Sequence, residues 1–331
     1  MTQKVVTKEE LFKKLNSLTG DFEVIGPKEY AQKGIFYETA VQADRLYLGE
    51  DFSIEPVKKF FLNPSEWLFD CRYKNGRNSL EDVLLPNSKR IIIGVRPCEA
   101  KGLALLDKVF NADKHKDEFY LNNRSRTTII GLACAKPDRA CFCTSLGGSP
   151  IESRGMDAII FAKAEGFIVE IITDKGQEIF GALGQILNET QRKSYALEKE
   201  KSKEMVRTKV KVRESLGGIF KNHYWGEVSR SCLSCGICTF LCPTCHCFDL
   251  VDEKRKRMRC YDGCAFADFT AEASGENPRP TKRERYRQRV YHKFDYFKKN
   301  FGENLCVGCG RCIRHCPVKI DISEIIDKAP C

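Results

Sequence analysis

The stretch CLSCGICTFLCP, residues 232–243, decides the fold of the second half of this chain. Its four cysteines, Cys232, Cys235, Cys238 and Cys242, follow the spacing C-x2-C-x2-C-x3-C-P. Steps of three residues place three thiolates around one side of a tight loop, where they can bind three corners of a cubane iron–sulfur cluster. The fourth cysteine points away and reaches a different cluster. One copy of this motif therefore predicts a second copy elsewhere.

The second copy is CVGCGRCIRHCP, residues 306–317. Because the last cysteine of each motif is a ligand of the other cluster, the two copies predict two [4Fe–4S] clusters with exchanged fourth ligands. The first cluster is predicted to bind Cys232, Cys235, Cys238 and Cys316, and the second Cys306, Cys309, Cys312 and Cys242. Three small residues should let backbone N–H groups approach the sulfurs, namely Gly236, Gly308 and Gly310.

Zinc and haem fit these cysteines less well. Zinc sites use paired C-x2–4-C knuckles with a long spacer, whereas each motif here is a continuous run of four cysteines. Residues 242–246, CPTCH, also spell the C-x-x-C-H of c-type haem attachment. That reading is set aside because Cys242 already belongs to the ferredoxin motif and no export signal is visible.

Composition limits the class of protein. The 331 residues, 42% hydrophobic, are enough for about two globular domains. Five of the 18 cysteines precede residue 216 and thirteen follow it. The N-terminal segment has no signal-peptide pattern, and no apolar run reaches the roughly 18–20 residues of a membrane-spanning helix. We therefore expect a cytoplasmic protein whose reduced thiols bind metal.

The formal net charge of +10 raises the question of an acidic partner. Cys242 and Cys306 are separated by 63 residues, and the insertion between the motifs, residues 248–305, carries a basic stretch, Arg279–Lys299, with nine Lys/Arg against two acids. Its aromatic residues recur at near-helical spacing: Tyr286, Tyr291, Phe294, Tyr296 and Phe297. Nucleic-acid binding would fit this composition. We favour a helix that packs its aromatics over the clusters, because each four-thiolate cluster adds about −2 of charge for cations to offset.

Residues 1–215 are predicted to form an α/β domain, because β-branched runs alternate with helical segments. A capping box of Thr7 and Glu10 begins the first helix, which should end at Gly20. A strand at Ile91–Val95 precedes a helix at Glu99–Phe110. Residues 216–331 are predicted to form the two-cluster ferredoxin-like domain with its basic insertion.

Four cysteines of the first domain suggest a third iron–sulfur site. Cys98 follows the strand at 91–95, and Cys134 ends another strand, with Cys141 and Cys143 close behind. Since the carboxyl ends of parallel strands lie along one edge of a sheet, these four thiols could converge there. C-x-C is not a standard cluster spacing and buried cysteines are common, so spacing alone leaves the site open.

Five segments together resemble the 4Fe–4S dicluster family, which includes the β subunit of NiFe sulfhydrogenases and the A subunit of anaerobic sulfite reductase. The segments are RPCEAKGLALLDKVF (96–110), CAKPDRACFCTSLGG (134–148), CLSCGICTFLCPTCHCFDL (232–250), NPRPTKRERYRQRVYHKF (277–294) and CVGCGRCIRHCPVKIDI (306–322). The resemblance implies a mainly helical domain of α-helical-ferredoxin type for the two-motif region. It also strengthens the third cluster, at Cys98, Cys134, Cys141 and Cys143.

Members of that family are electron-transfer subunits. The resemblance implies a place between a flavin-containing subunit, linked to NAD(P)H or ferredoxin, and a catalytic subunit of hydrogenase or sulfite reductase type. Clusters with four thiolate ligands have no open coordination position and so exchange electrons rather than bind substrate. No G-x-G-x-x-G fingerprint occurs, and no separated pair of C-x-x-C motifs could form a NiFe site. We therefore expect a non-catalytic subunit of an oxidoreductase complex.

Four cysteines of the second domain stay unassigned: Cys245, Cys247, Cys260 and Cys264. They could form another metal site, or they could be buried thiols beside the clusters, the interpretation that we favour. Cys245, Cys247 and Cys264 belong to the family pattern, whereas Cys71, Cys260 and Cys331 fall outside it and are expected to be ordinary thiols.

Two other functions remain as alternatives. A cysteine-based site around Cys245 and Cys247 could reduce a sulfur compound directly. An iron–sulfur protein could also bind nucleic acid through Arg279–Lys299.

Overall fold

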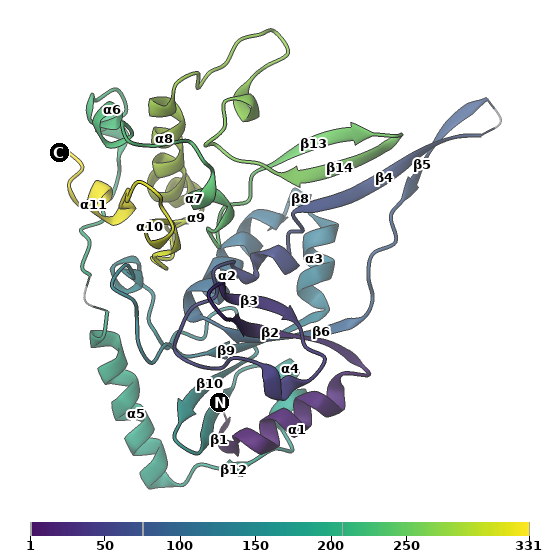
Figure 1. The fold of residues 1–331 in the computed structure, drawn as a ribbon, viewed down its shortest axis with the longest axis vertical. Coiled ribbons are helices and arrows are strands. Elements are labelled where there is room, and N and C mark those ends of the chain that lie inside the picture. Colours follow the sequence, from purple (N-terminus) through teal and green to yellow (C-terminus); the bar gives the residue numbers. More distant parts are fainter. Residues whose placement is uncertain (1, 75, 207, 331) are drawn as a thin grey trace.

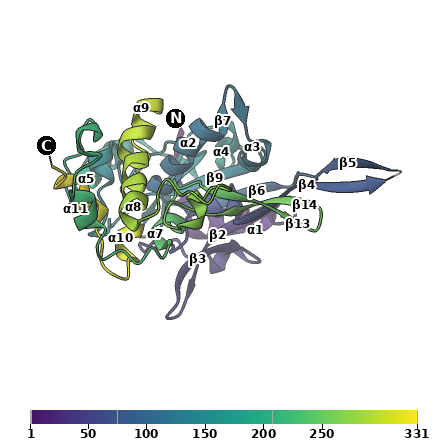
Figure 2. The same ribbon diagram turned by 90° about the horizontal axis from the view of Figure 1, so that it is seen from above.

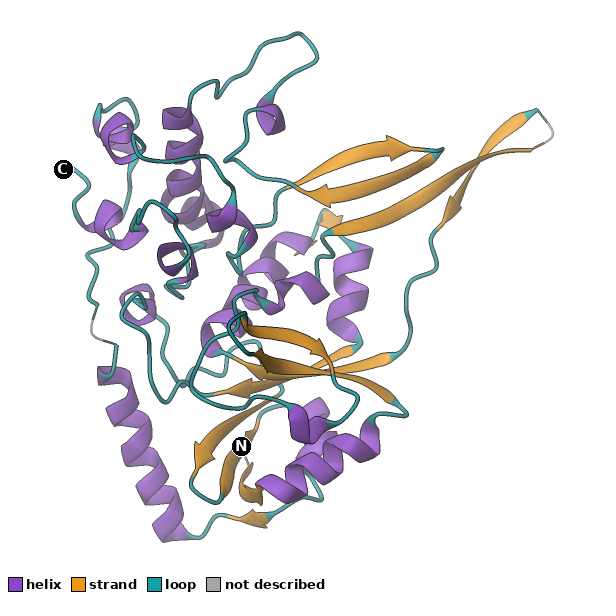
Figure 3. Cartoon of the chain, viewed as in Figure 1, coloured by secondary structure: helices purple, strands orange, loops and turns teal. Residues whose placement is uncertain are grey.

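The computed structural model of the chain describes residues 2–74, 76–206 and 208–330 (Figure 1). It contains a large mixed sheet flanked by helices, a four-stranded sheet, and a cysteine-rich part of short helices and loops (Figure 3). The sheet with its flanking helices confirms the predicted α/β class of the N-terminal part. Cys331 lies outside the described residues.

The large sheet brings the ends of two predicted strands together. Its members are β1 (Thr2–Thr7), β2 (Phe22–Tyr30), β3 (Gly34–Thr39), β6 (Lys89–Val95), β9 (Thr127–Leu132), β10 (Ala158–Lys163), β11 (Gly166–Ile171) and β12 (Gln185–Ile186). They follow the order β12-β1-β11-β10-β9-β6-β2-β3. The run β10-β9-β6-β2 is parallel, and the outer strands pair antiparallel. The segments that follow β6 and β9 therefore leave the sheet at the same edge.

Helices cover both faces of this sheet. One face carries α1 (Lys8–Leu18) and α4 (Asp174–Phe180), and the other carries α2 (Pro97–Phe110), α3 (Glu118–Ser125) and α5 (Glu189–Glu204). Ile91 and Ile93 pack into the core under α1, whereas Ile92 packs into the core under α2, because successive strand residues point to opposite faces. The predicted capping box is confirmed at α1, where Glu10 N donates to Thr7 Oγ1 at 3.1 Å.

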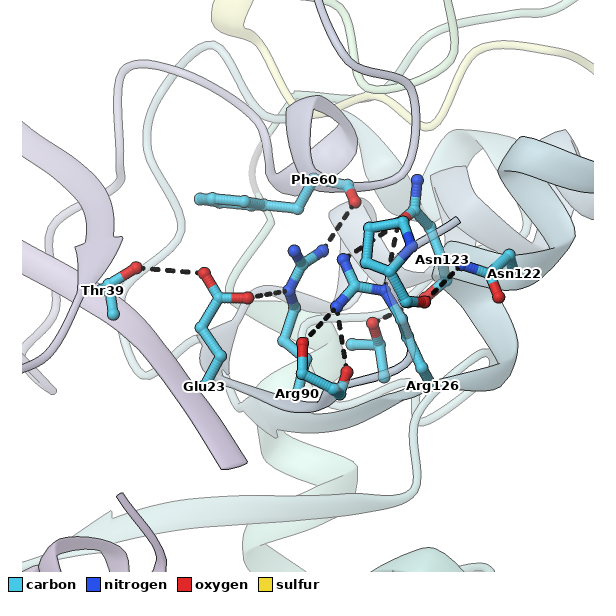
Figure 4. Close-up of polar contacts among 10 residues, drawn as sticks. Glu23, Thr39, Phe60, Arg90, Asn122, Asn123 and Arg126 are labelled. Atoms are coloured by element: carbon cyan, nitrogen blue, oxygen red, sulfur yellow. Dashed lines mark hydrogen bonds and ion pairs between the residues drawn. The ribbon is translucent and has the colours of Figure 1, made fainter. Parts of the chain in front are cut away.

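The edge of the sheet opposite to the cysteines is held by a polar network (Figure 4). Arg90, at the start of β6, donates from Nε to Glu23 Oε2 at 2.8 Å and from Nη1 to Phe60 O at 2.9 Å. Arg126, just before β9, donates to Asn123 Oδ1. The charged and polar groups of this network are hydrogen-bonded to one another, so we assign this edge of the sheet a structural role.

The second sheet joins the two halves of the sequence. It consists of β4 (Ser65–Lys74), β5 (Arg77–Asp82), β13 (Phe248–Glu253) and β14 (Lys256–Tyr261), in the order β13-β14-β4-β5. Figure 2 shows the β4–β5 hairpin projecting from the body. Buried Arg259 on β14 pairs with Glu66 on β4 at 2.6 Å and with Asp117, the N-cap of α3. The hairpin of β13 and β14 lies in the predicted basic insertion. The prediction of a mainly helical second domain did not include these two strands.

The cysteine-rich part is assembled around aromatic side chains. Its helices are α6 (Tyr224–Val228), α7 (Ile237–Phe240), α8 (Lys282–Tyr291), α9 (Phe297–Phe301), α10 (Arg311–Arg314) and α11 (Ile322–Asp327), and a π-helical turn, His292–Tyr296, joins α8 to α9. The core packs Trp225 against Tyr286, Tyr291 and Phe294. Most aromatics of the basic stretch thus point inward, as we expected of a helix packed over the clusters.

The remaining elements are short. A two-stranded hairpin pairs β7 (Asn111–Ala112) with β8 (His115–Lys116), and single 3-10 turns lie at Ala43–Arg45, Val57–Phe60, Cys143–Leu146, Gly217–Ile219 and Asp268–Thr270.

Glu303 ties the cysteine-rich part to the α/β part. Its carboxylate accepts from Lys108 of α2 at 2.5 Å and from Arg154 at 2.5 and 3.0 Å. Hydrogen bonds from Arg154 and Lys108 lower the pKa of Glu303 to about 2, against the effect of partial burial. A carboxylate with a lowered pKa stabilises the fold fully above its unfolded pKa of about 4.3, and this contribution is lost as the pH falls toward the folded value.

We predict that Glu303→Gln lowers the free energy of unfolding by about 1 kcal/mol at pH 7, since the group is partly solvated. The difference from the wild type should be the same at pH 5.5, because both pH values lie above the unfolded pKa. Urea unfolding of the anaerobic holoprotein measures it, with exposed Glu165→Gln as the control. A difference that vanishes already at pH 5.5 would contradict the assignment to Glu303.

Candidate functional site

The first motif forms a loop that leads into α7. Gly236 is the N-cap of α7 with a φ of 74°, a left-handed conformation that suits glycine. Five cysteines line one cavity there, with about 520 Å³ of empty space including open solvent. They are the four predicted for the first cluster, together with Cys312 of the second motif: Cys232, Cys235, Cys238, Cys316 and Cys312. Backbone amides face the sulfurs, since Ser234 N lies 3.4 Å from Cys232 Sγ and Ile320 N lies 3.2 Å from Cys316 Sγ.

The second motif repeats this local structure. Gly310, with a φ of 71°, is the N-cap of α10, as Gly236 is of α7. A second cavity of about 330 Å³ is lined by the other predicted set, Cys242, Cys306, Cys309 and Cys312. In both motifs, therefore, the fourth cysteine turns away from its own loop and faces the partner cavity.

Buried cations face these sulfurs. Lys293 is 2% exposed, and its Nζ donates to Cys242 Sγ at 3.1 Å and to Thr244 Oγ1 at 3.1 Å. Arg289 is also buried and donates from Nη1 to Cys245 Sγ at 3.3 Å and from Nη2 to Cys238 O at 2.7 Å. A buried cation is costly unless negative charge compensates it, so both contacts fit a centre bound by thiolates.

The acidity of the thiols follows from these contacts. A hydrogen bond from Cys245, with Lys293 close by, holds the pKa of Cys242 well below its usual value although burial opposes this. Burial raises the pKa of Cys306 to about 11 and also raises that of Cys312. Because thiolates are the metal-binding form, loading of the second cavity must displace protons from these cysteines.

A third cavity lies at the edge of the large sheet. Five cysteines line it, the four predicted for the third site and Cys309 of the second motif: Cys98, Cys134, Cys141, Cys143 and Cys309. Cys98 stands in the first turn of α2 directly after β6, and Cys134 lies two residues beyond the end of β9. The parallel strands thus deliver two of the thiols to one edge, and the loop after β9 folds back to bring the other two. The empty space is about 300 Å³.

The three cavities are contiguous through one loop. Cys312 lines both the first and the second cavity, and Cys309 lines both the second and the third. In the described part of the chain, no three His, Cys, Asp or Glu side chains are arranged to hold a single metal ion. The cysteines instead surround spaces between them, which suits clusters of several irons.

Glycines make the approach of this loop possible. Phe142 N donates to Gly308 O at 2.9 Å, and Gly308 has a φ of 64°. A Cβ on Gly308 would lie 2.6 Å from both Cys143 N and Phe142 C, and one on Gly310 would lie 2.6 Å from Ala140 O. The loop of the second motif therefore packs backbone to backbone against the loop of the third cavity.

The cysteines outside these three sets have different surroundings. Cys245, Cys247 and Cys264 lie near Arg289 and Lys293, and burial raises the pKa of Cys247 and raises that of Cys264 to about 11. All three side chains are partly buried, and their interpretation as thiols beside the clusters stays a prediction. Cys71 and Cys260 lie on β4 and β14 of the second sheet.

Sequence reasoning placed the cysteines but missed the charged residues that face them. From the sequence we noted Lys293 and Arg289 only as part of a basic stretch, and we gave no role at the site to Arg311 or Glu99. Arg311 stands between two ligand cysteines and Glu99 directly follows Cys98. The signal in the sequence that could have identified Arg311 and Glu99 was their position next to predicted ligand cysteines.

Two ferredoxin motifs with exchanged fourth cysteines define a two-cluster iron–sulfur protein. Residues 231–320 match the family of 4Fe-4S dicluster domains. The chain is 32% identical over 303 residues, 88% of each chain, to the sulfhydrogenase 2 subunit beta of Pyrococcus furiosus. A shorter match, 45% identical over 42 residues, covers 13% of the chain and 17% of an uncharacterized protein of Methanocaldococcus jannaschii. No solved structure matches the chain.

The chain belongs to the 4Fe–4S dicluster electron-transfer subunit family, and its cofactors include two [4Fe–4S] clusters. None of the helices among the described residues has the length and apolar character needed to cross a bilayer.

We predict that Gly308→Ala destabilises the protein more than Gly302→Ala does. Gly302 has a φ of 76° with open space around its Cβ position, so its substitution measures the conformational cost alone, about 1–2 kcal/mol. Gly308→Ala adds overlap with the backbone at residues 142 and 143, a further cost of about 1–3 kcal/mol. Urea unfolding and iron content measure both effects. If the two substitutions lowered stability and iron content equally, the close packing of the Gly308 loop against residues 142 and 143 would be contradicted.

Proposed function

We propose that this chain relays single electrons through three clusters, one in each cavity, between two other subunits of an oxidoreductase complex. One of these would be a flavin-containing subunit linked to NAD(P)H or ferredoxin, and the other a catalytic subunit of hydrogenase or sulfite reductase type. The observation that carries the proposal is the sharing of Cys309 and Cys312 between neighbouring cavities, which makes the three sites one continuous series.

The spacing of the cysteines and the linings of the cavities together support one set of ligands for each cluster. We assign Cys232, Cys235, Cys238 and Cys316 to the first cluster, Cys306, Cys309, Cys312 and Cys242 to the second, and Cys98, Cys134, Cys141 and Cys143 to the third. A [4Fe–4S] cluster with four thiolates stores and passes one electron and leaves no position for substrate. Two domains, residues 1–215 and a mainly helical ferredoxin-like 216–331, would hold the third cluster and the first two, respectively.

The residues of the chain fit this task. Lys293 and Arg289 offset negative charge around the second and first sites, and backbone amides donate to cysteine sulfurs. Fixed donors and cations that surround a cluster set its reduction potential without moving during the reaction. The exposed Cys235 and Leu233 place the first site nearest to the surface, where an electron could enter or leave.

The two alternatives find less support. A sulfur-compound reductase built around Cys245 and Cys247 needs a reactive thiolate. The hydrogen bond to Cys242 and burial raise the pKa of Cys245, and burial raises that of Cys247. Binding of nucleic acid through Arg279–Lys299 needs exposed aromatic rings, yet Tyr286, Tyr291, Phe294 and Phe297 are buried.

We predict about twelve irons per chain in the anaerobically purified protein and about eight in Cys134→Ser, since each cubane holds four. Cys71→Ser should keep the full number, because Cys71 lies on β4 of the second sheet. Iron and acid-labile sulfide analysis measures this. About eight irons in both the wild type and Cys134→Ser would contradict the presence of a third cluster.

We predict that Cys316→Ala interrupts the relay in the complex that co-purifies with a tagged chain. The rate with the physiological donor should fall more than tenfold, because the first cluster loses a ligand, whereas the catalytic subunit should keep its rate with a directly added one-electron dye. Cys260→Ala is the matched control on β14. Reduction of sulfite or polysulfide, or evolution of hydrogen, by the isolated chain would contradict the proposal.

A further inference from the structure

An ion pair without solvent contact joins two residues that are adjacent in sequence to cysteines of the second and third cavities. Glu99 and Arg311 are each 0% exposed, and Arg311 Nη2 lies 2.9 Å from Glu99 Oε1. Glu99 directly follows Cys98, which lines the third cavity, and Arg311 stands between Cys309 and Cys312, which line the second. The pair therefore joins the backbones that supply cysteines to both sites.

The carboxylate of this pair is saturated with donors from the α/β part. Tyr37 Oη donates to Glu99 Oε2 at 3.1 Å, Val57 N to Oε1 at 3.1 Å, and Arg96 N to Oε2 at 3.3 Å. Glu99 is thus fixed in place beside a cation and has no contact with solvent. A fixed negative charge at this depth acts strongly on any redox centre nearby.

The guanidinium of Arg311 is not saturated. Its Nε donates to Ser53 O at 3.2 Å, but Nη1 and Nη2 have no hydrogen-bond partner among the described residues, apart from the ion pair of Nη2 with Glu99. Buried N–H groups without acceptors are costly and therefore rare. Acceptors are expected close to these two nitrogens.

Arg311 stands in sequence beside cysteines assigned as ligands, since Cys309 lines both cavities and Cys312 lines the second. Burial raises the pKa of Cys98 and Cys134, and the positive charge of Arg311 is among the effects that oppose this rise. Arg96, the other cation that acts on Cys134, already donates to the carbonyl oxygens of Gly49, Asp51 and Ala133. Among these cations, Arg311 is the one with free donors between the two sites.

We propose that Arg311 is a positioning residue shared by two centres. Its guanidinium donates to the sulfurs of both the second and the third cluster, and with Glu99 it sets their two reduction potentials together. The inference rests on the cluster assignment proposed above. A nearby cation and N–H donors favour the reduced, more negative cluster and raise its potential, whereas a nearby carboxylate lowers it. The first cluster, on the far side of the second, lies outside this influence.

The test is a redox titration of the anaerobic holoprotein followed by EPR, with Cys316→Ala and Cys134→Ser identifying the signals of the first and third clusters. We expect Arg311→Gln to lower the potentials of the second and third clusters, and Glu99→Gln to raise both. Arg311→Lys should fall between Arg311→Gln and the wild type. Lys293→Gln is the matched control: Lys293 contacts Cys242, so its replacement should lower the potential of the second cluster alone.

Several results would overturn the inference. Potential shifts of equal sign in Arg311→Gln and Glu99→Gln would do so. Unchanged potentials in an Arg311→Gln protein with full iron content would also overturn it, but this result would not contradict the proposed electron relay. If Arg311→Gln does not retain its clusters, the test depends on Glu99→Gln. This substitution is nearly isosteric, and the upward shift of both potentials predicted for it can be measured without the Arg311→Gln protein. A wild type with only two clusters would instead refute the third-cluster assignment, and this inference with it.

Discussion

The structure depends on the close packing of one loop, residues 306–312, against the segment that carries Cys141 and Cys143. Gly308 and Gly310 allow this contact, because a Cβ at either position would overlap backbone atoms of residues 140–143. The same loop supplies Cys309 to two cavities and Cys312 to two. Its position therefore aligns all three sites and joins the cysteine-rich part to the edge of the large sheet.

Burial of many sulfur ligands has an electrostatic consequence. Lys293, Arg289 and Arg311 lie inside the protein, and the first two donate directly to Cys242 and Cys245. Part of the net positive charge of the chain is thus internal, and it compensates thiolates rather than attracting an external polyanion. The π-helical turn at His292–Tyr296 contains Lys293, and such turns frequently occur at functional sites.

Local spacing explains how much the sequence could predict. The two motifs specify their own loops, so the sequence could predict that the cysteines of each set, with Cys242 and Cys316 exchanged, line one cavity. Their role as cluster ligands stays a proposal. The third set was predictable as far as the strands could be recognised, because β6 and β9 end at one edge. The pairing of β14 with β4 and of Arg311 with Glu99 joins residues far apart in sequence, and no local pattern specifies such partners. The β13–β14 hairpin was missed for a different reason: its two-residue turn, Lys254 and Arg255, has a positive φ at both residues without the Gly or Asn that usually marks such turns.

The most direct test of the three-centre series is anomalous diffraction at the iron absorption edge from crystals of the anaerobic holoprotein. Three iron peaks should lie in a row, with the middle one enclosed by Cys242 and the loop at 306–312 and the outer ones beside Cys235 and Cys134. Two peaks only, or a third peak beside Cys247 and Cys264, would contradict it.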